Sequence, residues 1–295
     1  MRKPGAFIKI APRIVLLFFF AYFFFQVTKF YQKYRLIPDL KVKIQDQLKS
    51  SGFRCSLVIK DLDFPGLRFE IDSEKKIPAA SLIKLPILAG ALKAVEEGKV
   101  SLQDEVVIKG ADTAGGSGKL KAAMLPLTLT FEKLLEFMIS SSDNTATNKV
   151  IHILGFEYLN NSFKDFNLNE TVLTRKMMDF TKRRLGIENY TSSRDIVLLL
   201  DRIYNKKLVN KRLSRLALEF LKKQSINDRL SRYLPNEAII AHKTGLERGV
   251  VHDAGIIFAP EGNYIICVLL SKVKNYKKAK KFIAQTSLFT YNLYQ

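Results

Sequence analysis

Hydrophobic and polar positions follow different periods in different parts of the chain. Near both ends, short apolar or alternating runs are separated by turn residues such as 63–66 and 260–263, which is typical of β-strands. These runs are 55–60, 67–71, 238–242, 250–258 and 264–270. Apolar positions three and four residues apart predict helices in the middle of the chain and at its end. The helical stretches are 81–95, 131–153, 194–224 and about 276–294.

The order of these elements favours one fold class. Strands lie near both ends, helices lie between them, and no internal repeat is present. One antiparallel sheet built from both chain ends, flanked by helices and carrying an inserted all-helical subdomain over about 81–225, satisfies this order. We therefore expect an α/β (α+β) catalytic domain over residues 46–295, with its site where the sheet meets the subdomain.

The N-terminus has the pattern of a membrane anchor. Residues 1–13 include four basic and no acidic side chains, and residues 14–27 are almost entirely apolar with two Phe triplets. No small-residue cleavage site follows, so we expect an uncleaved single-pass signal anchor over 14–30, with a cleaved signal as the alternative. The fourteen apolar residues span roughly 21 Å against a core of about 30 Å, and snorkelling basic flanks close the gap. Basic residues before the span predict a cytoplasmic tail (1–13) and an extracytoplasmic domain on a bacterial cell membrane. Residues 31–45 are polar and basic and include Pro38, so we expect a short tether there.

The charge and residue composition indicate which classes of molecule the protein can bind. The 295 residues carry a formal net charge of +20, from 48 basic and 28 acidic side chains, which predicts attraction to polyanions. No nucleic-acid-binding signature is present, so we expect anionic lipid or wall polymer rather than nucleic acid. The lysine-rich stretch 272–281 is either a solvated helix face or such a docking surface. The three histidines lack metal-ligand spacing, so no metal and no cofactor are expected. Cys55 and Cys267 are expected to be buried free thiols, with a bridge left open if their strands are neighbours.

A hydrolase needs a nucleophile with a nearby base. The pattern Ser-x-x-Lys occurs three times, beginning at Ser73, Ser81 and Ser271, and only Ser81 opens an apolar helix. The three-residue spacing puts Lys84 on the same helix face as Ser81, and a partly desolvated lysine can accept the serine proton. This pair alone leaves open an ordinary capping serine beside a solvated lysine.

Two further motifs narrow that choice. Ser142-Asp-Asn144 follows a predicted helix, Lys243-Thr-Gly245 ends a predicted strand, and each occurs once. The ordered set Ser-x-x-Lys, Ser-Asp-Asn and Lys-Thr-Gly is far more specific than its parts. On these motifs and the stretches 78–88 and 95–104, residues 55–271 resemble a class A β-lactamase-type serine hydrolase of the β-lactamase and penicillin-binding protein superfamily.

The resemblance implies a β-lactamase/transpeptidase-like fold and the catalytic roles. Ser81 would be the acylated nucleophile, and Lys84 would activate it. Ser142 would relay a proton to the departing amine nitrogen.

The resemblance also implies how substrate is held. Asn144 would hydrogen-bond the side-chain amide of the substrate, and Lys243 and Thr244 would hold its carboxylate. Gly245 would let the substrate backbone approach. Backbone N–H groups of Leu246 and of the nucleophile would form the oxyanion hole.

The chain departs from this family in the loop between the second and third motifs. Class A β-lactamases carry a Glu there that drives water onto the acyl-enzyme; aligned on Arg175, its position is Met177, which cannot act as a base. Asp179 is a candidate deacylation base, with a structural salt bridge as the alternative, and Glu188 is expected to be structural. The Asp that closes this loop in the family corresponds approximately to Asn189. General-base catalysis is worth about 10²–10⁴ in rate, so we expect intact acylation and weak deacylation.

The sequence thus predicts a membrane-anchored serine hydrolase that cleaves a β-lactam or related amide through a Ser81 ester. Two alternatives stay open: a D,D-peptidase or related amidase or esterase acting on peptidoglycan-type peptides, and a penicillin-binding module without turnover. His242, His252 and Asp253 are expected to be structural, and Gly115–Gly118 is expected to form a rim of the substrate cleft.

Overall fold

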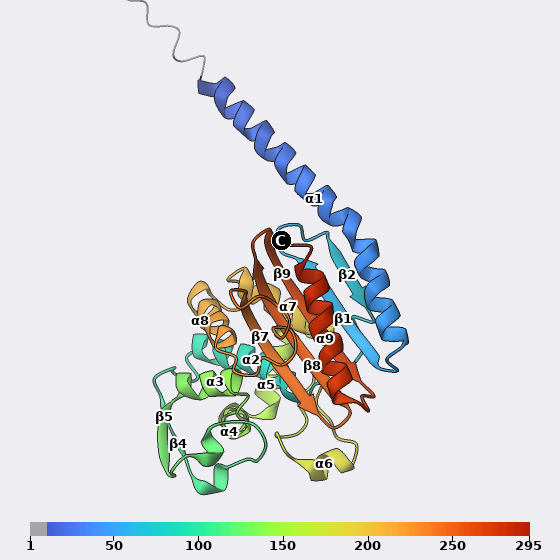
Figure 1. Ribbon diagram of the computed structural model, residues 1–295. Helices are drawn as coiled ribbons and strands as arrows, with labels where there is room; N and C mark the ends of the chain where they lie inside the picture. The colour runs from blue at the N-terminus through green and yellow to red at the C-terminus, as the bar shows by residue number, and fades with distance from the viewer. Residues whose placement is uncertain (1–10) are drawn as a thin grey trace, which may run out of the picture. The chain divides into compact units, whose positions relative to one another are not determined.

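The computed structural model describes residues 11–295, so most of the expected cytoplasmic tail lies outside the described residues. The chain divides into two units, residues 1–43 and residues 44–295. The helices are α1 (Ala11–Lys49), α2 (Lys84–Glu96), α3 (Phe131–Ser140), α4 (Asn144–Leu154), α5 (Phe156–Asp165), α6 (Phe180–Arg184), α7 (Ser193–Tyr204), α8 (Lys211–Lys222) and α9 (Tyr276–Tyr291) (Figure 1). The strands are β1 (Arg54–Asp61), β2 (Arg68–Ile71), β3 (Ile77–Pro78), β4 (Glu105–Ile108), β5 (Leu127–Thr130), β6 (Tyr190–Thr191), β7 (Ile239–Glu247), β8 (Val250–Ala259) and β9 (Gly262–Ser271).

One antiparallel sheet joins the two ends of the larger unit, which confirms the predicted fold class. Its strand order is β2-β1-β9-β8-β7, so the first strands of the unit pair directly with the last. Helices α7 and α9 both pack on the sheet and lie on opposite sides of it (Figure 1). Because both faces are covered, the central strand β9 is apolar without alternation, and Tyr264–Leu270 is fully buried.

Helix α2 is the centre of the helical part. It is buried on almost every side and packs against α3, α4, α5 and α7, which explains why the stretch from Ser81 to Val95 is apolar all round. The structure refines its start: residues 80–83 form a 3₁₀ turn, and the α-helix begins at Lys84. The predicted helical region 131–153 is two helices, because Asp143 caps α4 by accepting a hydrogen bond from the Ala146 N–H at 2.9 Å. Ser142 therefore lies in the short loop between α3 and α4.

The two cysteines are buried free thiols. Their strands are neighbours, but the register places Cys267 opposite Val58 and Cys55 opposite Leu270. Since successive side chains point to opposite faces, the two thiols face opposite sides of the sheet. This register explains why neighbouring strands do not produce a disulfide.

Helix α1 includes both the predicted anchor and the predicted tether, and it runs through Pro38. The Phe side chains of 18–20 and 23–25 are exposed. Among the helices of residues 11–295, none combines the length and the apolar character that crossing a bilayer requires.

Candidate active site

Ser81 and Lys84 lie on one face at the start of α2. They are three residues apart in and just after the 3₁₀ turn, where such positions eclipse one another. Ala80, directly before the serine, has a φ of +44°, a left-handed conformation that costs free energy in a residue with a Cβ. Lys84 has no exposed surface, so it is not the solvated lysine of the alternative interpretation.

Lys84 is enclosed by oxygen atoms of the second motif. Its Nζ donates to Ser142 O at 2.6 Å, to Asn144 Oδ1 at 2.8 Å and to Ser142 Oγ at 3.2 Å. Burial lowers the pKa of Lys84 well below its usual value, the charge of Lys243 lowers it further, and Asp143 raises it. A neutral lysine here donates to the two carbonyl oxygens and keeps its lone pair for a hydroxyl proton. This arrangement suits a general base.

Ser142 links the two lysines of the motifs. Lys243 Nζ donates to Ser142 Oγ at 2.9 Å and to Thr244 O at 3.0 Å. Burial lowers the pKa of Lys243 to about 7, with Asp253 raising it and Arg229 lowering it. Ser142 itself has a φ of +54°. The serine hydroxyl can accept a proton from one amine and donate one to the other, as a proton relay requires.

Strand β7 brings the third motif against the nucleophile. It is the edge strand of the sheet and contacts the 3₁₀ turn that carries Ser81, and alternate N–H groups of an edge strand have no partner within the sheet. A Cβ at Gly245 would lie 3.1 Å from the His252 ring and 3.5 Å from Ala79 O. Glycine therefore lets β7 and the turn approach closely.

His252, on β8, connects the segment just before the 3₁₀ turn to β9. Its Nε2 donates to Pro78 O at 2.8 Å, and its Nδ1 accepts from the Leu270 N–H at 3.1 Å. These partners fix one neutral tautomer, and burial lowers the pKa of His252 to about 4. The residue is structural, as expected.

The glycine-rich segment packs on Asn144. The Asn144 Nδ2 donates to Gly115 O at 2.8 Å, and the Asn144 N–H donates to Ser117 O at 3.1 Å. Gly116 has a φ of +77°, and a Cβ there would lie 2.8 Å from Asn144 Nδ2. The segment thus borders the site at the position predicted for the cleft rim.

Ser81 and Thr244 keep their side-chain hydroxyls available. Within residues 11–295, no protein group hydrogen-bonds either hydroxyl, although the Lys84 and Lys243 amines both hydrogen-bond to Ser142 Oγ. The motif residues Ser81, Lys84, Ser142, Asn144 and the Lys-Thr-Gly strand therefore form one site with two free hydroxyls, two amines and a carboxamide.

The sequence model of the beta-lactamase enzyme family matches residues 39–294. The chain belongs to the beta-lactamase enzyme family. It is 26% identical over 279 residues to beta-lactamase VEB-1 of Pseudomonas aeruginosa, an alignment that covers 87% of this chain and 90% of that protein.

Solved structures agree with this membership. The structure of PBP-A is 31% identical, with a TM-score of 0.78 and coverage of 86% of this chain and 95% of that one. The beta-lactamase of Sphaerobacter thermophilus is 26% identical, with a TM-score of 0.78 and coverage of 85% and 95%. The protein is accordingly a serine hydrolase of the class A β-lactamase type.

The loop that departs from the β-lactamase pattern is docked on α4. Asn148 Oδ1 accepts from the Met177 N–H at 2.7 Å, and Asn148 Nδ2 donates to Met177 O at 3.1 Å. The Met177 side chain is partly buried against the hydrophobic core. The Met178 sulfur instead lies over Gly116. Position 177 is thus fixed beside the helix that carries Asn144, without a titratable side chain.

Asp179 caps α6. Its Oδ1 accepts a hydrogen bond from the Lys182 N–H at 3.0 Å. In the part of the chain that the structure describes, no hydrogen bond or ion pair joins Asp179 to Ser81, Lys84 or Ser142. Asp179 as deacylation base therefore stays a prediction.

A cluster of two arginines and two glutamates joins the two ends of this loop, near residues 175 and 188. Arg175 donates to Glu188 Oε1 at 2.8 Å and to both Glu247 oxygens, at 2.9 and 3.1 Å. Asn189 Oδ1 accepts from the Arg175 N–H at 3.0 Å, and Arg183 shares both carboxylates. Glu188 is structural, as expected, and Asn189, at the position of the family's loop-closing Asp, holds the Arg175 backbone.

The sequence analysis missed three residues of the site's surroundings. Asn148 holds the loop at Met177, and Glu247 accepts a hydrogen bond from Arg175 where the two ends of the loop meet. The charge of Arg229 lowers the pKa of Lys243. Arg229 is buried and lies 2.9 Å from Asp228 Oδ1, but not in hydrogen-bond geometry. Asn148 and Glu247 lie four residues after Asn144 and two after Gly245, so proximity to the motifs was the available signal.

Proposed function

We propose that β-lactams and related amides acylate Ser81 and that the ester is released slowly. One contrast carries this proposal. Lys84, Ser142 and Lys243 are joined to one another by hydrogen bonds beside Ser81, whereas the loop position beside α4 carries Met177 and no base.

Acylation uses only groups of this site. Neutral Lys84 takes the Ser81 hydroxyl proton while Oγ bonds to the substrate carbonyl carbon. The developing oxyanion lies toward the backbone N–H groups of Ser81 and Leu246. As the C–N bond breaks, Ser142 gives its proton to the leaving nitrogen and regains one from Lys84.

The same site accounts for an anionic substrate. Lys243, when protonated, and the free hydroxyl of Thr244 would hold a carboxylate, and Asn144 would bind the amide beside the scissile bond. Lys243 also fixes Ser142 through its 2.9 Å hydrogen bond. Substrate binding and proton relay are therefore coupled through one side chain.

Deacylation lacks an evident base. A water molecule attacking the ester must lose a proton, and Met177 cannot accept it. Asp179 is the remaining candidate in the loop, but its carboxylate already caps α6. Without a positioned base the hydrolysis step should be slower by about 10²–10⁴.

A D,D-peptidase or related activity on peptidoglycan-type peptides is the second candidate. Met177 favours it over efficient β-lactam hydrolysis, and so does the likeness to PBP-A, a mutant of which forms an acyl-enzyme complex with penicillin G. This structure is 31% identical, with a TM-score of 0.79 over 86% of this chain. A binding module without chemistry is the weaker third candidate, because the nucleophile, base and relay are all present.

Labelling with a fluorescent penicillin tests the proposal. Wild type is expected to carry one label on Ser81, and Ser81→Ala none, while Ser73→Ala, in the exposed turn, labels like wild type. Release of D-alanine from a D-Ala-D-Ala peptide assigns the peptidase activity. A label that persists in Ser81→Ala would overturn the assignment of the nucleophile.

We further propose that the protein is held at a bacterial membrane with its catalytic unit outside the cytoplasm. The exposed Phe side chains of 18–20 and 23–25 and the basic flanks support an anchor at the lipid. Cell fractionation and N-terminal sequencing test this: the retained chain should begin before residue 14 and sediment with membranes. A chain that begins near residue 30, or an intact chain in the cytosol, would contradict it.

Anionic wall polymer or lipid is the proposed macromolecular partner. Lys272, Lys274, Lys277 and Lys278 are exposed at the start of α9, and Val273 and Tyr276 bond to Gly249 in the turn that follows β7. This basic surface therefore adjoins the strand of the Lys-Thr-Gly motif. Binding to anionic polymer or vesicles should weaken steeply with added salt.

A further inference from the structure

Two residues that pack against each other beside Asn144 both have left-handed backbones. Met178, in the loop, has a φ of +65°, and Gly116, in the glycine-rich segment, has a φ of +77°. A positive φ is open to glycine but costs free energy in methionine. Residues held in such conformations cluster at active sites and ligand contacts, so the Met178 side chain is a candidate for a role in the site.

The Met178 thioether occupies the space into which a side chain at position 116 would point. A Cβ at Gly116 would lie 3.0 Å from Met178 Sδ, 3.3 Å from Met178 Cε and 2.8 Å from Asn144 Nδ2. Glycine at this position therefore lets the thioether lie next to the Asn144 carboxamide. Met178 is partly exposed, so its thioether can contact a ligand, whereas the Met177 side chain packs against the hydrophobic core.

This contact lies at the acyl end of the site. Under the proposed function, Lys243 and Thr244 hold the substrate carboxylate, and Asn144 binds the amide beside the scissile bond. The group attached to that amide then extends past the Nδ2 end of Asn144, where Gly116 and the Met178 thioether lie. Met178 is therefore placed to contact this group.

The charged groups near this contact already have partners. The Asp143 carboxylate accepts hydrogen bonds from two backbone N–H groups, at 2.8 and 2.9 Å. The Asp179 carboxylate caps α6, and Lys121 Nζ donates to Gly116 O. The thioether is thus an apolar surface among paired groups, which suits an apolar ligand group better than a charged one.

We propose that Met178 determines the acyl-group specificity of the Ser81 reaction: its thioether selects an apolar, preferably aromatic, group on the amide that Asn144 binds. Methionine suits this role because its flexible, polarizable side chain adapts to a ligand and its sulfur contacts aromatic rings favourably. This specificity rests on the proposed function, since the acylation step defines the group that is selected. Met178 contacts the substrate and takes no part in making or breaking bonds.

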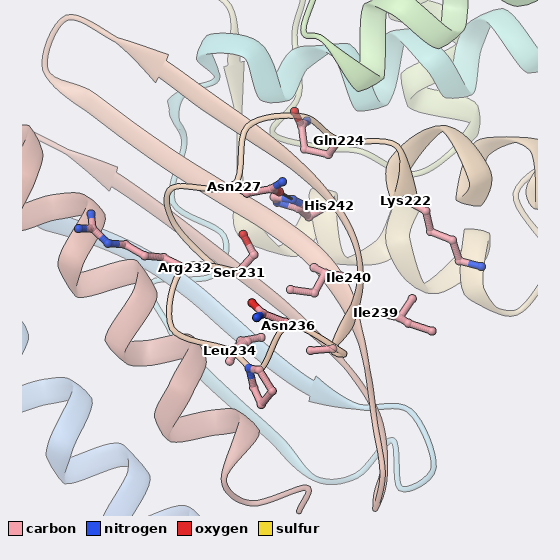
Figure 2. A pocket seen from close by; sticks show the side chains of 12 residues that line it. Lys222, Gln224, Asn227, Ser231, Arg232, Leu234, Asn236, Ile239, Ile240 and His242 are labelled. Atoms are coloured by element: carbon pink, nitrogen blue, oxygen red, sulfur yellow. Dashed lines mark hydrogen bonds between the residues drawn. The ribbon is translucent and has the colours of Figure 1, made fainter.

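A second place for an apolar group is the cavity of about 520 Å³ at the connection between α8 and β7 (Figure 2). Ile239 and His242 are among its lining residues. Lys243 follows His242 directly and, because side chains alternate along a strand, faces the other side of β7. An acyl group on Ser81 therefore belongs to the side of Met178, and Ile239, which is 55% exposed, provides a control position.

Acylation by three penams tests the proposal. Benzylpenicillin carries an aromatic acyl group, α-carboxybenzylpenicillin carries that group with an added carboxylate, and 6-aminopenicillanic acid carries no acyl group. The second-order rate constant for adduct formation on the full wild-type chain, followed by intact mass, should be highest for benzylpenicillin. Met178→Gly also relieves the left-handed backbone, and it should reduce the preference for benzylpenicillin over 6-aminopenicillanic acid by about three- to tenfold. Met178→Gln, which keeps the length but adds a polar end, should reduce this preference as well, and Ile239→Ser should leave it unchanged.

The ratio of these two rate constants separates specificity from mere support of the glycine-rich segment. If Met178 only holds that segment in place, Met178→Gly slows both penams equally and the ratio stays at the wild-type value, which would overturn the proposal. A wild type that prefers the carboxylated penam, or a ratio that falls in Ile239→Ser, would overturn it too. If no penam forms an adduct on Ser81, the proposed function itself fails, whereas a normal adduct with an unaltered ratio in Met178→Gly contradicts only the role of Met178.

Discussion

Replacing Arg175 by methionine should loosen the loop that carries Met177. The Arg175 side chain is 2% exposed, and Glu188 and Glu247, which it contacts, are 9% and 16% exposed. Arg183 lies 3.3 Å from Glu188 and 3.1 Å from Glu247, but its side chain is 24% exposed. Arg175→Met therefore leaves two poorly solvated carboxylates with a single, more exposed partner.

The size of the effect follows from this burial. Removing one partner of a buried ion pair costs about 3–5 kcal/mol, and we take the lower end, about 3 kcal/mol, because Arg183 remains. For a domain of this size, about 1 kcal/mol moves the melting temperature by about 2–4 °C, so a decrease of about 6–12 °C is expected. Arg183→Met removes the more exposed partner and should cost less than about 1 kcal/mol.

Thermal melts followed by circular dichroism check these values. The double variant Arg175→Met/Glu188→Gln should recover part of the loss, because it also removes one of the stranded charges. If Arg175→Met lowers the melting temperature by less than about 2 °C, the view that this ion cluster holds the loop is refuted. It is also refuted if Arg175→Met lowers the melting temperature no more than Arg183→Met does.

The loop and the two active-site lysines give further predictions. Met177→Glu should speed release of the penicilloyl group by about 10²–10⁴, whereas Met178→Glu, next to it but turned toward Gly116, should leave release unchanged in quench-flow measurements. The acylation rate should rise with pH as Lys84 loses its proton, with a midpoint below the usual pKa of lysine because burial lowers it. Lys243→Gln removes a neighbouring positive charge, so it should raise the pKa of Lys84 and move that midpoint to higher pH. In wild type, the KM for an anionic β-lactam should increase above about pH 7, where Lys243 loses the charge that holds the substrate carboxylate; a KM that is flat from pH 6 to 8.5 would contradict this.

The sheet and the three motifs could be predicted from the sequence because each has a local signal. Apolar runs between turn residues gave the positions of β1, β2, β7, β8 and β9. Because these runs lie near the two chain ends, the sequence predicted one sheet built from both ends, while the order of its strands came from the structure. The spacing of Ser81 and Lys84 placed them on one face, which the 3₁₀ turn satisfies.

What could not be predicted depends on partners far along the chain. The β4–β5 hairpin consists of two strands of four residues, too short for a clear alternation. Asp179 has no local pattern that distinguishes a helix cap from a base. The ion cluster of Arg175 joins residues 72 positions apart, and no periodicity reports such a contact. Burial decides the pKa of Lys84, and burial exists only after folding.

The lifetime of the penicillin adduct tests the central claim most directly. The protein is mixed with penicillin G, free drug is removed, and intact mass is followed over time, with peptide mapping to locate the adduct. Our account predicts one stoichiometric adduct on Ser81 that persists after the drug is removed and that disappears quickly in Met177→Glu. A wild-type protein that is already free at the first time point while penicillin is consumed catalytically would contradict it.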